Sequence, residues 1–174
     1  MHTRQTALDT LERSTRAFLD LLDGVSDAQW RIRPAGQEWS MAETVEHVVL
    51  ANRGVRGALG RLRASPLAAD AERYDDAAIG GDMFRTAAPA PPGAADPTGC
   101  YATRADGVTA LRASCDAIAA SANEATIDLR ANGVVHPVFG VFDGVQWILF
   151  AAAHTDNHVP QLRALRDATR DDAR

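Results

Sequence analysis

Apolar residues recur every three or four positions near the start of the chain, and this helical period constrains the fold more than any other feature. Gly24 stands just past Asp23, where the predicted helix ends. The members of the stripe are Leu8, Leu11, Thr15, Phe18, Leu22 and Val25. Residues 3–23 are therefore predicted to form an amphipathic helix of about six turns, with Gly24 as its stop signal.

Three further helices are predicted from capping signals that stand directly before apolar stripes. Each signal is a pair of polar residues three positions apart: Ser40 with Glu43, Thr103 with Asp106, and Asp143 with Gln146. Such a pair is typical of a capping box, in which two side chains satisfy the free N–H groups of a helix start. The three helices are expected to end near Ser65, Asn123 and Asp167.

Four helices, no strong strand signal and no internal repeat predict an all-α fold, a four-helix bundle in one domain over residues 1–174. Residues 66–102 are a long connection between the second and third helices, with room for a short helix at 68–79. The proline-rich stretch 87–99 excludes a regular helix or a central strand there. We expect this connection to be a crossover that covers a site. Residues 132–144 are expected to form an extended loop that allows a short strand pair.

Composition and charge narrow the classes of function. The chain has 174 residues, of which 46% are hydrophobic and 24% charged, and its formal net charge is −5. A nucleic-acid-binding surface usually carries a basic excess, so no nucleic-acid partner is expected. No stretch approaches the roughly 18 apolar residues of a membrane span. With two cysteines and a polar N-terminus, we expect a cytoplasmic protein with reduced thiols that acts on a small molecule.

Two histidines lie on the apolar face of the last predicted helix. His154 and His158 are four positions apart and share this face with Trp147, Ala151, Leu162 and Leu165. A third histidine, His47, lies at the edge of the valine stripe of the second helix. Burying each neutral imidazole without a partner would cost about 1–3 kcal/mol. One divalent metal ion would satisfy all three, and three protein ligands with an open fourth position are typical of catalytic zinc.

Other interpretations stay open for these residues. A histidine pair at this spacing is common by chance, so His154 and His158 could also be packing residues. Cys115 falls on the apolar stripe of the third helix, where a buried thiol acts as a small hydrophobic group. Cys100 is expected to be a surface thiol in the connection, and His136 an exposed loop residue.

Three stretches together resemble one known family. They are RPAGQEWSMAETVEHV at 33–48, HPVFG at 136–140 and HTDNHVPQL at 154–162. In a chain of this length they resemble the DinB-like superfamily, which includes the DinB and YfiT-type metalloenzymes, and the similarity spans nearly the whole chain. The combination is specific, whereas each piece alone is weak.

The resemblance implies a site, a fold and a class of activity. It implies a metal triad at His47, His154 and His158, a helix start at Trp39, Ser40 and Glu43, and a glutamine after the last histidine at Gln161. It also implies a four-helix bundle with a long crossover between the second and third helices, Zn²⁺ or Ni²⁺ as the metal, and frequent dimers. Characterised members are similar to S-transferases and isomerases that use thiols such as mycothiol or bacillithiol, and others to metal-dependent hydrolases.

The leading hypothesis is therefore a metal-dependent S-transferase that joins a low-molecular-weight thiol to a small electrophile. A metal-dependent hydrolase and a non-catalytic, stress-related binding module are the alternatives. Glu43 is a candidate catalytic residue, although its capping role explains it better. The candidate pocket residues are Trp39, Trp147, Phe150 and Gln161.

Pro160 departs from a regular helix pattern, because it removes one backbone hydrogen bond and crowds the carbonyl of Asp156. A kink or a local widening just after His158 is predicted. If the helix ended there instead, both histidines would still be in place, because they precede the break.

Overall fold

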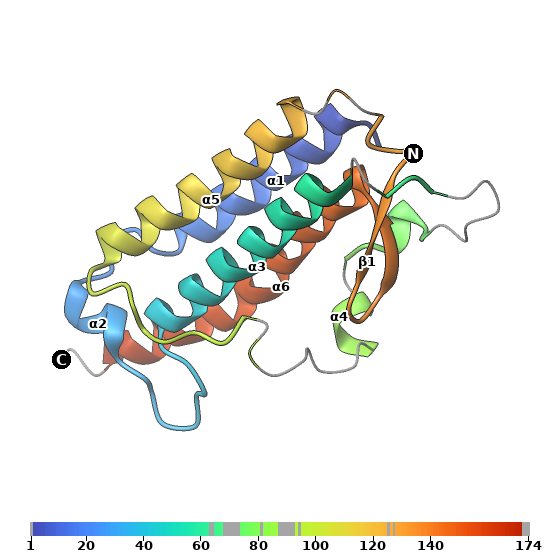
Figure 1. The fold of residues 1–174 in the computed structure, drawn as a ribbon. Helices are drawn as coiled ribbons and strands as arrows, with labels where there is room; N and C mark the ends of the chain where they lie inside the picture. Colours follow the sequence, from blue (N-terminus) through green and yellow to red (C-terminus); the bar gives the residue numbers. More distant parts are fainter. Residues whose placement is uncertain are drawn as a thin grey trace.

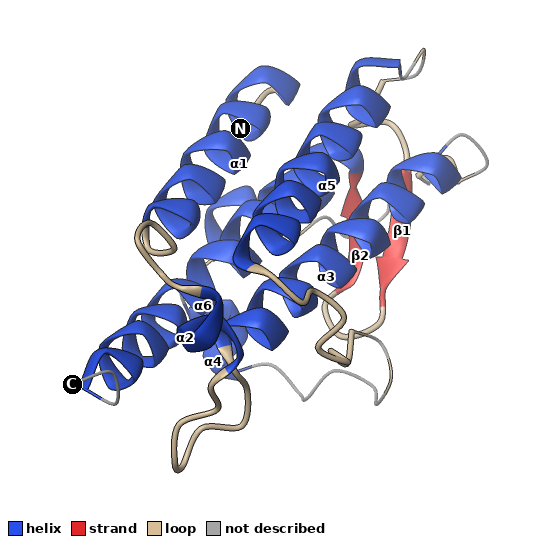
Figure 2. Ribbon diagram, turned by 90° about the vertical axis from the view of Figure 1, so that its left-hand side faces the viewer, coloured by secondary structure: helices blue, strands red, loops and turns tan. Residues whose placement is uncertain are grey.

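The structure, a computed structural model, is mostly helical. It describes residues 2–62, 65–67, 74–80, 82–86, 93, 95–124, 126 and 128–171. Its long helices are α1 (Arg4–Asp20), α3 (Met41–Arg61), α5 (Arg104–Glu124) and α6 (Gly144–Asp171). They run alongside one another, and α1 and α3 each pack against both α5 and α6 (Figures 1 and 2).

Short elements fill the connections between the long helices. Helix α2 (Asp27–Arg31) lies between α1 and α3, and the 3-10 turn η2 (Asp76–Ala78) and helix α4 (Asp82–Thr86) lie between α3 and α5. Strands β1 (Gly133–His136) and β2 (Gly140–Asp143) form an antiparallel hairpin that packs beside α6. The short strand pair that the sequence allows is thus formed. Residues 68–73 of the possible helix at 68–79 lie outside the described residues.

The three predicted capping boxes are confirmed at the starts of α3, α5 and α6. In each box the first side chain accepts the backbone N–H of the later residue, and the later side chain accepts the backbone N–H of the first. The pairs are Ser40 with Glu43, Thr103 with Asp106, and Asp143 with Gln146. The predicted ends are less accurate, since α1 ends at Asp20 and α3 at Arg61.

Helix α6 continues through Pro160 to Asp171, so the alternative in which the helix ends at this proline is wrong. Residues 161–165 keep their places on the helix, and Leu162 and Leu165 are fully buried. The kink itself stays a prediction. No helix of the described residues has the length and apolar character to cross a membrane.

Helix α2 is not among the four predicted helices, yet it supplies one of the largest buried side chains. Trp30 is 0% exposed, and its indole N–H donates to the carbonyl of Tyr101 at 2.9 Å. A Cβ at position 107 would lie 2.5 Å from the Trp30 ring, so the close approach of α5 to this ring requires Gly107. Trp30 therefore joins the connection before α3 to the start of α5.

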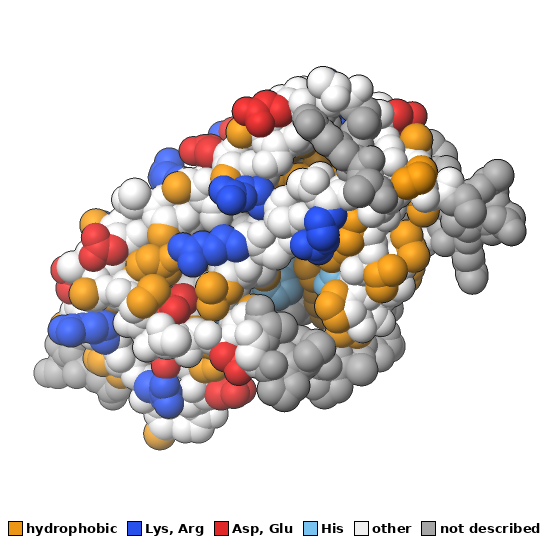
Figure 3. All heavy atoms as spheres, in the orientation of Figure 1, with side chains coloured by type: hydrophobic (Ala, Val, Ile, Leu, Met, Phe, Trp, Pro, Cys, Tyr) orange, Lys and Arg blue, Asp and Glu red, His pale blue; other side chains and the backbone are white. Residues whose placement is uncertain are grey.

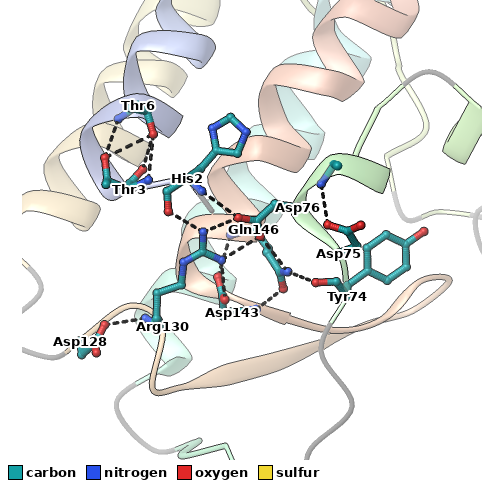
Figure 4. A network of polar contacts seen from close by, with 11 residues as sticks. His2, Thr3, Thr6, Tyr74, Asp75, Asp76, Asp128, Arg130, Asp143 and Gln146 are labelled. Atoms are coloured by element: carbon teal, nitrogen blue, oxygen red, sulfur yellow. Dashed lines mark hydrogen bonds and ion pairs between the residues drawn. The ribbon is translucent and has the colours of Figure 1, made fainter.

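A network of polar contacts fixes the long connection against the start of α6 (Figure 4). The Arg130 guanidinium lies 2.6 Å from the Asp76 carboxylate and 2.8 Å from that of Asp143, and it also donates to the carbonyl of His2 at 2.6 Å. Asp76 accepts further hydrogen bonds from the His2 backbone N–H and the Gln146 side chain. The Arg130 guanidinium holds the pKa of Asp76 well below its ordinary value. The N-terminus, the connection and the hairpin thus meet at one charged cluster.

Candidate metal centre

Three histidines from two helices meet in the middle of the molecule. His47 comes from α3, and His154 and His158 from successive turns of α6. One ring nitrogen of each lies within 4.8 Å of the others, and the Nε2 atoms of His47 and His154 are 3.2 Å apart. Within the described part of the chain, no other His, Cys, Asp or Glu joins this group. Figure 3 shows histidine side chains at the bottom of a hollow in one face of the molecule.

Hydrogen bonds on the outer side of two rings determine which nitrogen faces inward. The Nδ1 of His47 lies 2.8 Å from the carbonyl oxygen of Ala95, and the Nδ1 of His158 lies 2.8 Å from Oε1 of Gln161. Because both partners are acceptors, each Nδ1 carries the proton and donates it. The Nε2 atoms of His47 and His158 therefore keep their lone pairs, as metal ligands must.

The spacing of one nitrogen pair, from His47 and His154, fits a small divalent cation. A tetrahedral ion with bonds of about 2.0–2.1 Å holds its ligand nitrogens roughly 3.3 Å apart. The 3.2 Å between Nε2 of His47 and Nε2 of His154 is close to this value. Since Nε2 of His47 has a lone pair, this contact requires either a proton on the His154 nitrogen or a cation bound by both. The donor set of three imidazoles suits Zn²⁺ and Ni²⁺ alike.

The surroundings keep all three imidazoles neutral near pH 7. Burial lowers the pKa of His158 to about 4 and also lowers that of His47. The pKa of His154 is also lowered well below its ordinary value, first by burial and then by the neighbouring histidines. A protonated imidazole cannot bind a metal, so burial prepares the site for a cation at neutral pH. The Nδ1 of His154 is buried and has no hydrogen-bond partner among the described residues.

Aromatic rings flank the triad on two sides. The Trp39 ring lies 4.7 Å from His47 and 6.3 Å from His158, measured between ring centres. On the other side, Phe84 and Phe150 lie 5.8 Å and 5.7 Å from His154. The described part of the connection between α3 and α5 therefore contacts the triad twice, through the Phe84 ring and the Ala95 carbonyl.

The candidate pocket residues divide into two groups. Trp39, Phe150 and Gln161 contact the triad directly. Trp147 instead packs against the rings of His136, Phe142 and Phe150, and its indole N–H donates to the carbonyl of Val134 at 3.3 Å. Trp147 thus attaches the hairpin to α6, and its ring contacts do not include the three histidines of the triad.

Glu43 has the capping role that the sequence favours. Its carboxylate accepts hydrogen bonds from the backbone N–H and the hydroxyl of Ser40 and also pairs with Arg33. Burial raises the pKa of Glu43, but these bonds outweigh burial and the net pKa is lowered. Its lone pairs are engaged at the helix start, so this carboxylate is a poor candidate for a general base.

The other candidate ligands lie apart from the triad. Cys115 is partly buried on α5, with its sulfur 3.2 Å from the Thr15 hydroxyl, and Cys100 is an exposed free thiol. His136 is not an exposed loop residue, because it ends β1 and lies partly buried among aromatic rings. Among the described residues, the two thiols and His136 therefore add no ligand to the three imidazoles.

Sequence patterns missed the contacts that orient the triad. The carbonyl of Ala95 belongs to the backbone, so its residue type does not reveal that it accepts a hydrogen bond from His47. Phe84 lies in a connection without strong periodicity, so its position is not indicated by the sequence. Glu46, the residue before His47 on α3, is buried and accepts backbone N–H groups of residues 98–100, which follow Ala95 in the same connection. The sequence signal for Glu46 is its place among the apolar residues Val45, Val48 and Val49, where an unpaired carboxylate would not be expected.

A family model for the DinB superfamily matches residues 10–162, a range that includes all three histidines and Gln161. No curated protein and no solved structure matches the chain.

Proposed function

The chain belongs to the DinB superfamily, and from this premise we propose that it is a divalent-metal-dependent S-transferase, which joins a low-molecular-weight thiol to a small electrophile. The observation that carries the proposal is the convergence of three neutral imidazoles on one point. The four long helices and the long connection between α3 and α5 also support the four-helix bundle with a crossover that such enzymes have.

His47, His154 and His158 would hold the metal, as Zn²⁺ or Ni²⁺. A divalent ion bound by three neutral imidazoles supplies positive charge that lowers the pKa of a thiol or of water. The Ala95 carbonyl and Gln161 hold two of the rings in the tautomer that presents Nε2. The apolar rings beside the partly buried imidazoles exclude part of the solvent and so strengthen electrostatic interactions there.

The carboxylates near the triad are already engaged, and this favours attack by a thiol on the electrophile over hydrolysis by water. Attack by water is helped by a general base within hydrogen-bond reach, as in other metal-dependent hydrolases. Glu43 is engaged with Ser40 and Arg33, and Glu46 with the backbone of residues 98–100. Asp96 is exposed and accepts the backbone N–H of Gly93. A thiol is far more acidic than water and needs no such base, so it is the better nucleophile for this site.

The aromatic walls support an apolar electrophile as the second substrate. Trp39 is partly exposed and lies against two of the histidines, so one of its faces is available to an apolar group. Phe84 and Phe150 offer similar surfaces beside His154. Flat apolar groups gain about 0.5–1.5 kcal/mol from such ring contacts beyond simple burial.

The test is a conjugation assay with a fluorogenic haloalkyl probe. The reaction forms a sulfur–carbon bond between thiol and probe and releases a halide ion and a proton. Protein loaded with Zn²⁺ or Ni²⁺ is compared with metal-free protein, using mycothiol, bacillithiol, glutathione and coenzyme A in turn. We expect metal-dependent acceleration with at least one of these thiols, and equal rates with and without metal for all four would refute the proposal. Hydrolysis of activated esters by the same samples would indicate the hydrolase instead.

A further inference from the structure

Glu46 is a buried carboxylate next to a proposed metal ligand. It precedes His47 on α3 and is 4% exposed. Its Oε2 atom accepts the backbone N–H groups of three successive residues, Thr98 at 3.0 Å, Gly99 at 2.6 Å and Cys100 at 3.0 Å. Its Oε1 atom accepts the Thr98 hydroxyl at 2.9 Å. Every one of these partners lies in the last part of the connection between α3 and α5.

The backbone of this segment is shaped to surround one oxygen. Gly99 has a φ of +76°, which lets three consecutive N–H groups point to the same side of the chain. A charged acceptor makes hydrogen bonds about twice as strong as a neutral one. Glu46 therefore attaches residues 98–100 firmly to α3.

The same segment carries the atom that orients His47. Ala95 lies three residues before Thr98, and its carbonyl accepts the proton of His47 Nδ1 at 2.8 Å. The Ala95 carbonyl is the partner that determines the tautomer of this ring. Its position depends on the anchor that follows it in the chain, because a free connection would let the carbonyl move away from His47.

We propose that Glu46 is a positioning residue: by anchoring residues 98–100 it holds the Ala95 carbonyl on His47 and so presents Nε2 of His47 for metal binding. This inference rests on the proposed metal site. It assigns part of the metal affinity to the contact between Glu46 of α3 and residues 98–100 of the connection. The three metal ligands are the same as in the proposed function.

The experiment compares Glu46→Ala and Glu46→Gln with the wild type. Affinity for Zn²⁺ is measured by competition with a chromophoric chelator. The His47 tautomer in metal-free protein is measured from the ¹⁵N chemical shifts of the imidazole nitrogens. Asp106→Asn is the matched control, because Asp106 also accepts a backbone N–H and a hydroxyl, both from Thr103, at the start of α5.

Glu46→Ala is expected to weaken Zn²⁺ binding about 10- to 100-fold and to change His47 from the Nδ1–H form to a mixture of tautomers. Glu46→Gln is expected to lose roughly fivefold, because its amide oxygen can still accept the N–H groups without the charge. Asp106→Asn should leave both readouts unchanged, even if it melts at a lower temperature. A merely structural role for Glu46 would lower the melting temperature and leave the tautomer as it is.

Wild-type affinity together with a wild-type tautomer in the Glu46 variants would overturn the inference and leave the metal site standing. If Glu46→Ala does not fold, Glu46→Gln decides by the same two readouts. If the wild type itself binds no metal, the proposed function fails, and the tautomer of His47 in the variants still decides whether Glu46 positions this ring.

Discussion

His136 and the triad histidines share burial but differ in the proton that each ring carries. Burial lowers the pKa of His136 to about 4, as it does for His158. The Nδ1 of His136 accepts the backbone N–H of Val138 at 3.1 Å, so its proton is on Nε2. In His47 and His158 the Nδ1 atom donates instead. Burial alone thus makes an imidazole neutral, whereas the partner on the outer nitrogen decides whether the inner one can be a ligand.

The largest effect is expected from His154→Ala. This change removes one of the three nitrogens of the triad, and two imidazoles on different helices are left. We expect stoichiometric metal in the wild type and almost none in the variant, measured by elemental analysis of protein purified with Zn²⁺ or Ni²⁺. His136→Phe is the control and should keep its full metal content. Unchanged metal in His154→Ala would show that the triad is not the binding site.

A smaller effect is expected from Gln161→Leu, which removes the acceptor on the outer nitrogen of His158. Loss of such a partner typically weakens metal binding about 10- to 100-fold. Gln161→Glu should retain most of the affinity, because a carboxylate still accepts the Nδ1 proton. Chelator competition measures both variants, and equal affinity of Gln161→Leu and the wild type would mean that the hydrogen bond does not orient the ring.

The smallest effect concerns acid stability and separates His136 from the triad. The folded pKa of His136 is about 4, below the ordinary value of 6.5, so the unfolded chain binds more protons between these two values. His136 therefore contributes stability that is present above pH 6.5 and lost as the pH falls toward 4. In His136→Phe this contribution to the pH dependence is absent.

Urea unfolding of His136→Phe and wild type at pH 8 and at pH 5 tests this. Relative to the wild type, the variant should be more stable at pH 5 than it is at pH 8, although it loses the acceptor for the Val138 N–H at both. The triad titrates in both proteins, so its contribution cancels in the difference. A stability difference that is the same at both pH values would show that His136 is not kept neutral by burial.

Local signals predicted the starts of the long helices, because a capping box and an apolar stripe act between residues a few positions apart. Ser40 and Thr103 begin their helices as expected, and His154 and His158 share a helix face through their spacing alone. Helix ends were less accurate: α1 ends at Asp20 and α3 at Arg61, where the next residues, Leu21 and Leu62, bond to the carbonyl three positions back instead of continuing the helical pattern. Helix α2 was missed, although Ser26 and Gln29 form a capping box there as well.

The chain's sequence by itself determined the helical class, the family and the paired histidines of α6, because each depends on residue types at short, regular spacings. The sequence also pointed to His47 as the third ligand, but only the tertiary structure placed its Nε2 atom 3.2 Å from that of His154, because 107 positions of chain separate the two residues. The tertiary structure also decided which nitrogens face inward. The partners responsible are a backbone carbonyl at Ala95 and the anchor at Glu46, which become neighbours only when the connection packs against α3.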